Sequence, residues 1–155
     1  MILYHGTTES IAKRIFRDKR IKTTTTDTAR YKDMGHWNTT PGFVYVSNII
    51  NVAWGYAIEP SGSDYPDGRR SYVLFKINVP DAEVEIDMDN EEMKSCVSQL
   101  YQNGEGCYRI SRDLIFGTDV IGWVSISIRS YNEGCRYADS EIFPDKVNQF
   151  WRIIN

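Results

Sequence analysis

The sequence predicts one α+β domain over residues 1–155, and three observations lead to this fold class. With 155 residues, of which 41% are hydrophobic, the chain has enough apolar material for one core and too little for two ordinary domains. Short runs rich in β-branched and aromatic residues predict several strands, most of them in the second half. Apolar residues at helical spacing predict two early helices and shorter ones later.

The N-terminal part predicts a strand, a helix and a long loop. Residues 2–4 are apolar and predict a short strand, and Gly6 allows the chain to turn after it. Thr7 or Thr8 is then the expected N-cap of a helix. The apolar face of this helix comprises Ile11, Ala12, Ile15 and Phe16. Residues 23–42, rich in Thr, Asp, Asn and Gly, have no apolar period and predict a loop.

The rest of the chain alternates between predicted strands and predicted helices. Further strands are expected at residues 42–47, 71–80, 107–111, 120–128 and 140–143, and helices at 50–59, 90–101 and 145–154. Ser47 or Asn48 is the expected cap of the helix at 50–59. Hydrophobic and acidic residues alternate over 82–89, which predicts a half-buried strand. Its inner face would comprise Val84, Ile86 and Met88, and its acidic face Glu83, Glu85, Asp87 and Asp89. Metal binding by its acidic face is the alternative.

Several classes of protein lack support in the sequence. The three cysteines are widely spaced and form no C-x-x-C pair, so we expect buried thiols rather than a disulfide framework or a metal site. The chain contains no Gly-rich nucleotide motif, no zinc-protease motif and no serine-hydrolase elbow. No apolar run approaches the roughly 20 residues that span a bilayer, and no signal-peptide pattern is present. We therefore expect a cytoplasmic protein that does not contact membranes.

Charge is unevenly distributed along the chain, although the formal net charge is only -3. Residues 1–60 contain eight Lys and Arg against five Asp and Glu, whereas the remainder contains ten against sixteen. Most of the excess base lies in the stretch KRIFRDKRIK. Such a stretch is either a solvated face or a contact for a diphosphate or a nucleic-acid backbone.

The histidines and two tyrosines are the first candidates for chemistry. Only His5 and His36 are present, so any histidine mechanism must use one of them. Tyr45 lies in the predicted strand at 42–47, and Tyr56 follows eleven residues later in the next helix. A strand, turn and helix of this length can bring both rings to one cleft, where they could sandwich a flat or cationic heterocycle. The alternative is that both rings belong to the core and that His5 is an incidental polar residue.

Three blocks of the sequence resemble the signature blocks of the ADP-ribosyltransferase fold. In chain order they are LYHGT, GFVYVSNIINVAWGYA and DSEIF, and the resemblance covers residues 3–8, 42–57 and 140–154, about a quarter of the chain. The branch they resemble is the His-Tyr-Glu branch of poly(ADP-ribose) polymerases and diphtheria-type toxins. The resemblance implies a split, bent β-sandwich with short helices around a central cleft that binds NAD, without a Rossmann unit and without a metal.

The resemblance also implies roles for individual residues. His5 would bind the adenosine ribose hydroxyls, and the backbone of Gly6 would bind the nicotinamide carboxamide. Tyr45 and Tyr56 would stack on the two faces of the nicotinamide ring. Glu141 would be the catalytic acidic group, with Tyr45 and His5 completing the catalytic set.

One position departs from the family pattern, and further contacts are less specific. Where the polymerases have a serine that bonds the carboxamide, this chain has Ala53, so Ser47 is a candidate replacement. Thr7 and Arg14 are further candidates for the cofactor site. Contacts to the diphosphate could come from Lys13 or Arg30 as well as from Arg14. Arg109 and Arg112, in the stretch YRISRD, are weaker candidates. Asp139 would share a strand face with Glu141 and contact the acceptor, and a position in a loop is the alternative.

The chemistry of this reaction needs a single carboxylate. Cleavage of the bond between nicotinamide and ribose passes through an oxocarbenium-like state, but nicotinamide departs neutral and needs no proton. A carboxylate held against the ribose 2'-hydroxyl stabilises the developing positive charge and can take a proton from the acceptor. A surface position is the alternative for Glu141.

We therefore expect an NAD-dependent mono-ADP-ribosyltransferase that modifies a nucleic acid or a protein and releases nicotinamide. The tail resembles the thymidine ADP-ribosyltransferases of single-stranded DNA, whereas Asp139 favours a protein acceptor. A short catalytic domain over 1–155 is typical of a toxin, effector or phage enzyme, for which a neutralising antitoxin or hydrolase is a candidate partner. The alternatives are a non-catalytic module that binds NAD or ADP-ribose, and an enzyme that modifies a small antibiotic.

Overall fold

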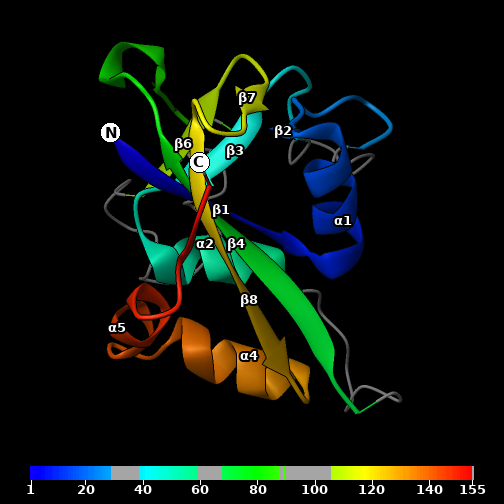
Figure 1. Cartoon of the computed structure of the whole chain (residues 1–155), viewed down its shortest axis with the longest axis vertical. Coiled ribbons are helices and arrows are strands. Elements are labelled where there is room, and N and C mark those ends of the chain that lie inside the picture. Colours follow the sequence, from blue (N-terminus) through cyan, green and yellow to red (C-terminus); the bar gives the residue numbers. More distant parts are fainter. Residues whose placement is uncertain (29–38, 59–67, 88, 90–105, 155) are drawn as a thin grey trace.

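Two long antiparallel strands, β4 (Arg70–Asn78) and β8 (Val120–Ile128), form the centre of the structure (Figure 1). The computed structural model describes residues 1–28, 39–58, 68–87, 89 and 106–154. Among these residues, seven strands form one sheet in the order β5-β6-β3-β1-β4-β8-β9. The other members are β1 (Ile2–Thr8), β3 (Val44–Ser47), β5 (Glu85–Ile86), β6 (Cys107–Ile110) and β9 (Arg152–Ile153). A separate pair joins β2 (Arg20–Ile21) and β7 (Leu114–Ile115).

Helices cover both faces of this sheet, so the chain is mixed α+β, as the sequence predicts. Alternate residues of β4 point to opposite faces. Phe75 packs on the side of α1 (Glu9–Asp18), and Leu74 packs on the side of α2 (Ile50–Ala57). The second face is also covered by α4 (Tyr131–Ala138) and α5 (Phe143–Asn148). Figure 1 shows α1 well apart from these three helices.

The first helix confirms the predicted cap and most of the predicted apolar face, of which Ile11 is the exception at 39% exposure. The side chain of Thr8 caps α1 by accepting a hydrogen bond from the amide of Ile11 at 3.4 Å. Ala12 and Ile15 are buried beneath the helix, and the ring of Phe16 packs against Phe75 with 5.3 Å between centroids. The predicted turn at residue 6 is wrong, because β1 continues straight through it to its end at the capping threonine.

Gly6 is the point at which α2 crosses β1. A Cβ atom built there would lie 2.0 Å from the carbonyl oxygen of Ala53 and 2.9 Å from the Cβ of Ala57. Only a residue without a side chain allows a helix backbone to approach a strand this closely. The glycine therefore serves close packing rather than a turn, and this contact sets the position of α2 on the sheet.

The acidic alternation at 82–89 does not form the predicted strand. It is divided into the short 3-10 helix η1 (Asp81–Glu83) and the two-residue β5. Val84 packs against the core as expected, but the burial is reversed further along, because Ile86 is 55% exposed and Asp87 is 6% exposed. The amide of Asp87 donates to the carbonyl of Cys107, one position beyond the last pair of β5 with β6.

The C-terminal region departs furthest from the prediction. Instead of a strand at 140–143 and a long helix, the chain forms α4, a turn, α5 and the short strand β9. Ser130 caps α4 by accepting from the amide of Glu133, whose carboxylate accepts in return from the amide of Arg129. This is a variant of the capping box, in which the glutamate returns to the amide of the residue before the N-cap instead of to that of the N-cap itself. Pro144 in the first turn of α5 favours a helix start there, since its missing N–H costs nothing at that position.

Other expectations lie outside the described residues. These are the helix at 90–101, parts of the loops at 23–42 and 60–70, and the residues Arg30, His36, Met88 and Cys96.

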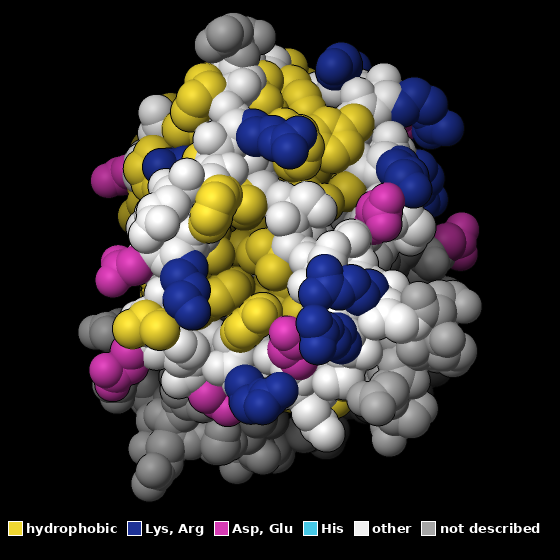
Figure 2. Space-filling view, turned by 60° about the horizontal axis from the view of Figure 1, so that its bottom comes forward, with side chains coloured by type: hydrophobic (Ala, Val, Ile, Leu, Met, Phe, Trp, Pro, Cys, Tyr) yellow, Lys and Arg dark blue, Asp and Glu magenta, His cyan; other side chains and the backbone are white. Residues whose placement is uncertain are grey.

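Large hydrophobic side chains remain exposed near the C-terminus. Ile142, Phe150 and Ile153 are 58%, 66% and 72% exposed. The ring of Trp151 stacks on Tyr4 with 5.8 Å between centroids. On the face seen in Figure 2, hydrophobic side chains form a broad area bordered by Lys and Arg. None of the helices in the described part of the chain has the length and apolar character to cross a membrane.

The contact at Gly6 predicts a strong and local effect of a single methyl group. We expect Gly6→Ala to lower the free energy of unfolding by about 3 kcal/mol, because the added carbon meets backbone atoms that cannot rotate away. Gly55→Ala is the matched control, since a Cβ there meets nothing within 4 Å. The control should gain up to about 1 kcal/mol from helix propensity. Urea unfolding measures both, and equal stability of the two variants would contradict the packing argument.

Candidate functional site

The first two sequence blocks meet where β1, β3 and α2 come together. β1 and β3 are joined by the pair Tyr4↔Ser47, so these two residues face the same side of the sheet. Tyr45 precedes Ser47 by two positions and shares that side. The hydroxyl of Tyr56, from α2, lies 3.6 Å from the Sγ of Cys107, which pairs with Ser47 in the sheet. The structure therefore brings Tyr45, Ser47 and Tyr56 over one face of β3 and β6.

His5 lies on the opposite face of β1 and connects the two strands. Its partner on β4 is Phe75, which belongs to the core on the α1 side. The Nδ1 atom of His5 lies 2.8 Å from the carbonyl oxygen of Tyr45. A carbonyl oxygen only accepts, so Nδ1 carries the hydrogen and Nε2 is the acceptor of the neutral ring. The His5 side chain thus links β1 to β3 one residue further along β1 than the pair Tyr4↔Ser47.

Burial controls the charge of this histidine. It lowers the pKa of His5, and the hydrogen bond to the Tyr45 carbonyl opposes that shift without cancelling it. His5 is therefore neutral at physiological pH, with its Nε2 lone pair available as a hydrogen-bond acceptor.

The phenol of Tyr45 is held by a carboxylate that the sequence analysis did not single out. The hydroxyl lies 2.5 Å from Oδ2 of Asp89 and 2.8 Å from the carbonyl oxygen of Thr40. Thr40 in turn donates its amide to Oδ2 and its hydroxyl to Oδ1 of Asp89, both at 2.7 Å. Arg109, which pairs with Tyr45 in the sheet, places a guanidinium nitrogen 3.8 Å from Oδ1.

These contacts favour a neutral phenol beside an ionised carboxylate. Burial raises the pKa of Tyr45, and the hydrogen bond to Asp89 raises it further. Burial alone would raise the pKa of Asp89, but the hydrogen bonds from Thr40 and Tyr45 outweigh it and leave the pKa below the ordinary value. Tyr45 is thus the donor to a charged acceptor over the whole physiological range of pH.

Glu141 and Asp139 lie in the connection between α4 and α5. Glu141 is exposed in the turn, and Asp139 is the exposed C-cap of α4. The prediction that they share one face of a strand is wrong, because no strand forms here. The reason is local: the capping box starts α4 upstream, and Pro144 starts α5 immediately downstream.

Asn51 ties this connection to the first turn of α2. Its Nδ2 lies 2.8 Å from the carbonyl oxygen of Ala138, 3.0 Å from that of Ser140 and 3.4 Å from that of Tyr137. A helix rises about 1.5 Å per residue, so Asn51 and Tyr56 are separated by about 7.5 Å along the axis. The turn with Glu141 is therefore held at the opposite end of α2 from Tyr56.

The remaining predicted contacts are dispersed. Ser47 is fully buried, and its Oγ accepts from the amide of Ile49 at 3.0 Å, which stabilises the turn into α2. Thr7 is buried within β1, on the same side as His5. Arg14 is exposed on α1. Lys13, an equivalent candidate, pairs with Glu9 at 2.9 Å.

Arg112, another weak candidate, has a structural role. It contacts Asp119 through both terminal nitrogens, at 2.8 and 2.9 Å, and also pairs with Glu83. The carboxylate of Asp119 further accepts from the amide of Ile115. These bonds organise the chain between β6 and β8.

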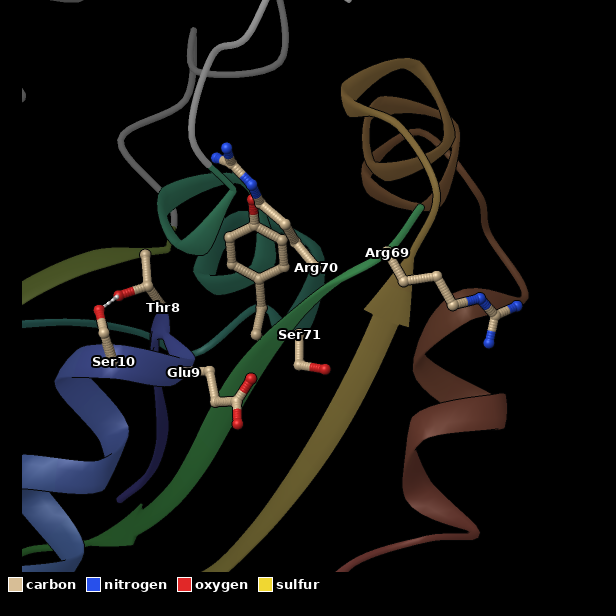
Figure 3. Close-up of a pocket in the computed structure, with 7 residues that line it drawn as sticks. Thr8, Glu9, Ser10, Arg69, Arg70 and Ser71 are labelled. Carbon is tan, nitrogen blue, oxygen red and sulfur yellow. Dashed lines mark hydrogen bonds between the residues drawn. The ribbon is translucent and has the colours of Figure 1, made fainter. Parts of the chain in front are cut away.

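A polar pocket of about 300 Å³ lies at the end of β1 (Figure 3). Its lining comprises Thr8, Glu9, Ser10, Arg69, Arg70, Ser71 and Tyr72. Figure 3 shows the guanidinium groups of Arg69 and Arg70 pointing away from each other, with the carboxylate of Glu9 between them and α1. The two arginines therefore do not converge on one anion. No group of three or more metal-binding side chains occurs within the described ranges.

Comparisons with protein-family models, with curated proteins and with solved structures give no significant match to this chain.

The buried neutral His5 predicts a measurable pH dependence of stability. The unfolded chain binds a proton near its ordinary pKa of about 6.5, whereas the folded chain binds it only at lower pH, so stability falls as the pH drops below 6.5. His5→Asn keeps a donor near the position of Nδ1 but does not titrate. We expect wild type to lose more stability than this variant between pH 7.5 and 5.5 in urea unfolding. Parallel pH profiles of the two proteins would contradict the burial of a neutral ring.

The contacts of Asn51 predict a sensitivity to a one-atom change. Asn51→Asp replaces the donor by a carboxylate that faces carbonyl oxygens, and we expect a loss of about 2 to 3 kcal/mol of unfolding free energy. Asn148→Asp is the matched control, because Oδ1 of Asn148 accepts from the indole N–H of Trp151 and a carboxylate can do the same. Thermal unfolding at pH 7.5 measures both. Similar shifts for the two variants would show that the polarity of Asn51 is unimportant.

Proposed function

We propose that this protein is an NAD-dependent mono-ADP-ribosyltransferase, with the ADP-ribosyltransferase-like split sheet around a central NAD cleft. The single observation that carries the proposal is the junction of β1 and β3. In the described residues their register consists of the pair Tyr4↔Ser47, after which only the His5 side chain reaches across to the backbone of Tyr45. A single residue pair between these two strands, with one sequence block on each strand, supports the proposal of a ligand site between them.

The side chains around this junction suit the two ends of NAD. Tyr45 and Tyr56 lie over the same part of the sheet, where aromatic faces favour a flat cationic ring. The neutral Nε2 of His5 is a hydrogen-bond acceptor, which suits a ribose hydroxyl. The backbone edge of Gly6 remains the proposed contact of the carboxamide, approached from the β3 side because β4 pairs along the other edge and Ala53 of α2 covers one face.

The proposed reaction uses a carboxylate and no acid catalyst. Nicotinamide leaves as a neutral molecule with the electron pair of the glycosidic bond, and positive charge develops on the ribose. Glu141 is the proposed group that stabilises this charge and receives the proton of the acceptor. Asp139 is proposed to contact the acceptor, which is a nucleic acid or a protein.

A second function is favoured by the position of Glu141. An exposed turn residue is poorly placed to stabilise charge, because water screens its interaction with the substrate. Together with Ala53, this position favours a non-catalytic module that binds NAD or ADP-ribose. The two functions share the ligand site and differ in whether NAD is consumed.

Release of nicotinamide from NAD tests the proposed reaction. We expect wild type to release nicotinamide and Glu141→Gln to do so about a hundredfold more slowly, as for the loss of one charge-stabilising group. Asp145→Asn, an exposed carboxylate in the first turn of α5, is the control and should match wild type. Single-stranded DNA, RNA and cell lysate protein are added separately, and chromatography measures the free nicotinamide.

The pattern of release distinguishes the two functions. Release that rises with one class of acceptor and depends on Glu141 supports the transferase and identifies its target. If NAD raises the melting temperature but stays intact with every acceptor, the binding module replaces the transferase. If NAD neither binds nor reacts, both functions are wrong.

A further inference from the structure

We propose that Asp89 is a positioning residue, which holds the ring of Tyr45 in one orientation so that an aromatic ligand can stack on it. The inference rests on the proposed function, because the nicotinamide ring of NAD is the ligand that Tyr45 would stack against. Asp89 itself does not contact the reacting atoms in this proposal. It acts through the phenol hydroxyl.

The hydrogen bond between the Tyr45 hydroxyl and Asp89, called the tether below, does not itself cover a face of the ring. A phenol donates its hydrogen bond close to the plane of the ring, so the contact between Tyr45 and Asp89 is made at the ring edge. The other end of the ring is fixed by its place in β3, opposite Arg109. Holding both ends fixes the long axis of the ring, and rotation of the ring about this axis would carry Asp89 out of the ring plane and weaken the bond.

The carboxylate of Asp89 is itself fixed by contacts from more than one residue. Thr40 donates two hydrogen bonds to the carboxylate, one to each oxygen, and Arg109 lies beside the same group. The guanidinium of Arg109 is also held in place, since it lies 4.1 Å from the centroid of Phe43 and pairs with Glu85. The carboxylate oxygens are therefore occupied by donors, which suits a positioning role better than nucleophilic or basic catalysis.

The tether joins three parts of the chain at one phenol. Thr40 belongs to the loop before β3, Tyr45 to β3 itself, and Asp89 to the segment after β5. Backbone bonds between Thr24 and Phe43 and between Gly42 and Thr24 hold the same loop from its other side. Because the loop is fixed independently, the Asp89 contact is not needed to close it.

Preorganisation of an aromatic side chain changes affinity in a predictable way. Immobilising a side chain on binding costs about 0.5 to 1.5 kcal/mol, which corresponds to about a twofold to tenfold change in Kd. If the hydrogen bond to Asp89 already immobilises the Tyr45 ring in the unliganded protein, Asp89→Ala should raise the Kd by that factor. Asp89→Asn keeps one acceptor oxygen and should give an intermediate value.

The test measures binding of carba-NAD, an NAD analogue whose carbocyclic ribose cannot form an oxocarbenium ion. Calorimetry gives the Kd for wild type, Asp89→Ala, Asp89→Asn, Tyr45→Phe and the double variant Asp89→Ala/Tyr45→Phe. If Asp89 acts through the hydroxyl of Tyr45, the two single variants raise the Kd by similar factors and the double variant raises it no further. The proposal is wrong if the double variant raises the Kd by the product of the two single factors, or if Asp89→Ala leaves the Kd unchanged.

Asp113→Ala is the matched control for a general loss of stability. Its carboxylate accepts from the amide of Thr23 at 2.9 Å and pairs with Arg20, so it also fastens the loop before β3 without touching Tyr45. We expect this variant to lose stability and to keep the wild-type Kd. A raised Kd in Asp113→Ala would show that loop stability alone controls affinity and would overturn the positioning role.

A second readout separates the tether from the proposed function. In protein labelled with 3-fluorotyrosine, the fluorine signal of Tyr45 is assigned by its absence in Tyr45→Phe. We expect Asp89→Ala to move this signal and to lower the pH at which it titrates, with or without any ligand. If the signal responds but wild type does not bind carba-NAD, the tether exists and the proposed function is wrong, and the role in stacking falls with it. If wild type binds and the signal does not respond, the tether is wrong while the proposed function stands.

Discussion

The helix α2 packs directly against β1 because residue 6 is a glycine. Because the carbonyl of Ala53 occupies the space of a side chain, the helix lies directly on the strand. Its buried residues then contribute to the core on that face, and Trp54 donates its indole N–H to the carbonyl of Gly134 in α4. Tyr56 and Asn51 extend from the two ends of the same short helix. One glycine therefore sets where the aromatic pair and the C-terminal helices lie.

Buried charge in this protein serves two separate purposes. Asp119 is 3% exposed and is satisfied by Arg112 and a backbone amide, so it stabilises the connection around β7. Asp89 has a comparable set of donors, but one of them is the phenol of a predicted ligand contact. An ionised carboxylate in a partly buried position needs such donors to offset the loss of hydration. The identity of the donors, rather than the carboxylate, distinguishes the structural network from the one at the candidate site.

Sequence patterns predicted the elements with strong periodicity and failed where local capping decided the outcome. The helix capped by Thr8 and the strands β4 and β8 were predicted because their apolar residues recur at the spacing of their final structure. At the C-terminus, the serine and glutamate of the capping box at the start of α4 and Pro144 carried the information, but no long apolar face accompanied them. At the candidate site, Tyr45 and Tyr56 were predicted to lie near each other, and both lie over the strands β3 and β6. The role of Asp89 was missed because the alternation of hydrophobic and acidic residues over 82–89 predicts one strand. It does not reveal that β5 ends at Ile86, before Asp89.

The place of β1 in the sheet has a consequence for how the chain folds. This strand stands between β3 and β4, and its register runs from Ile2↔Asn78 to Thr8↔Tyr72. The two partners of this first strand therefore come much later in the sequence. Closing such a long segment costs entropy before any ladder bond forms, which slows folding relative to a sheet of neighbouring hairpins. During synthesis β8 emerges after β1, β3 and β4, so its pairing with β4 is the last of these ladders that can begin to form.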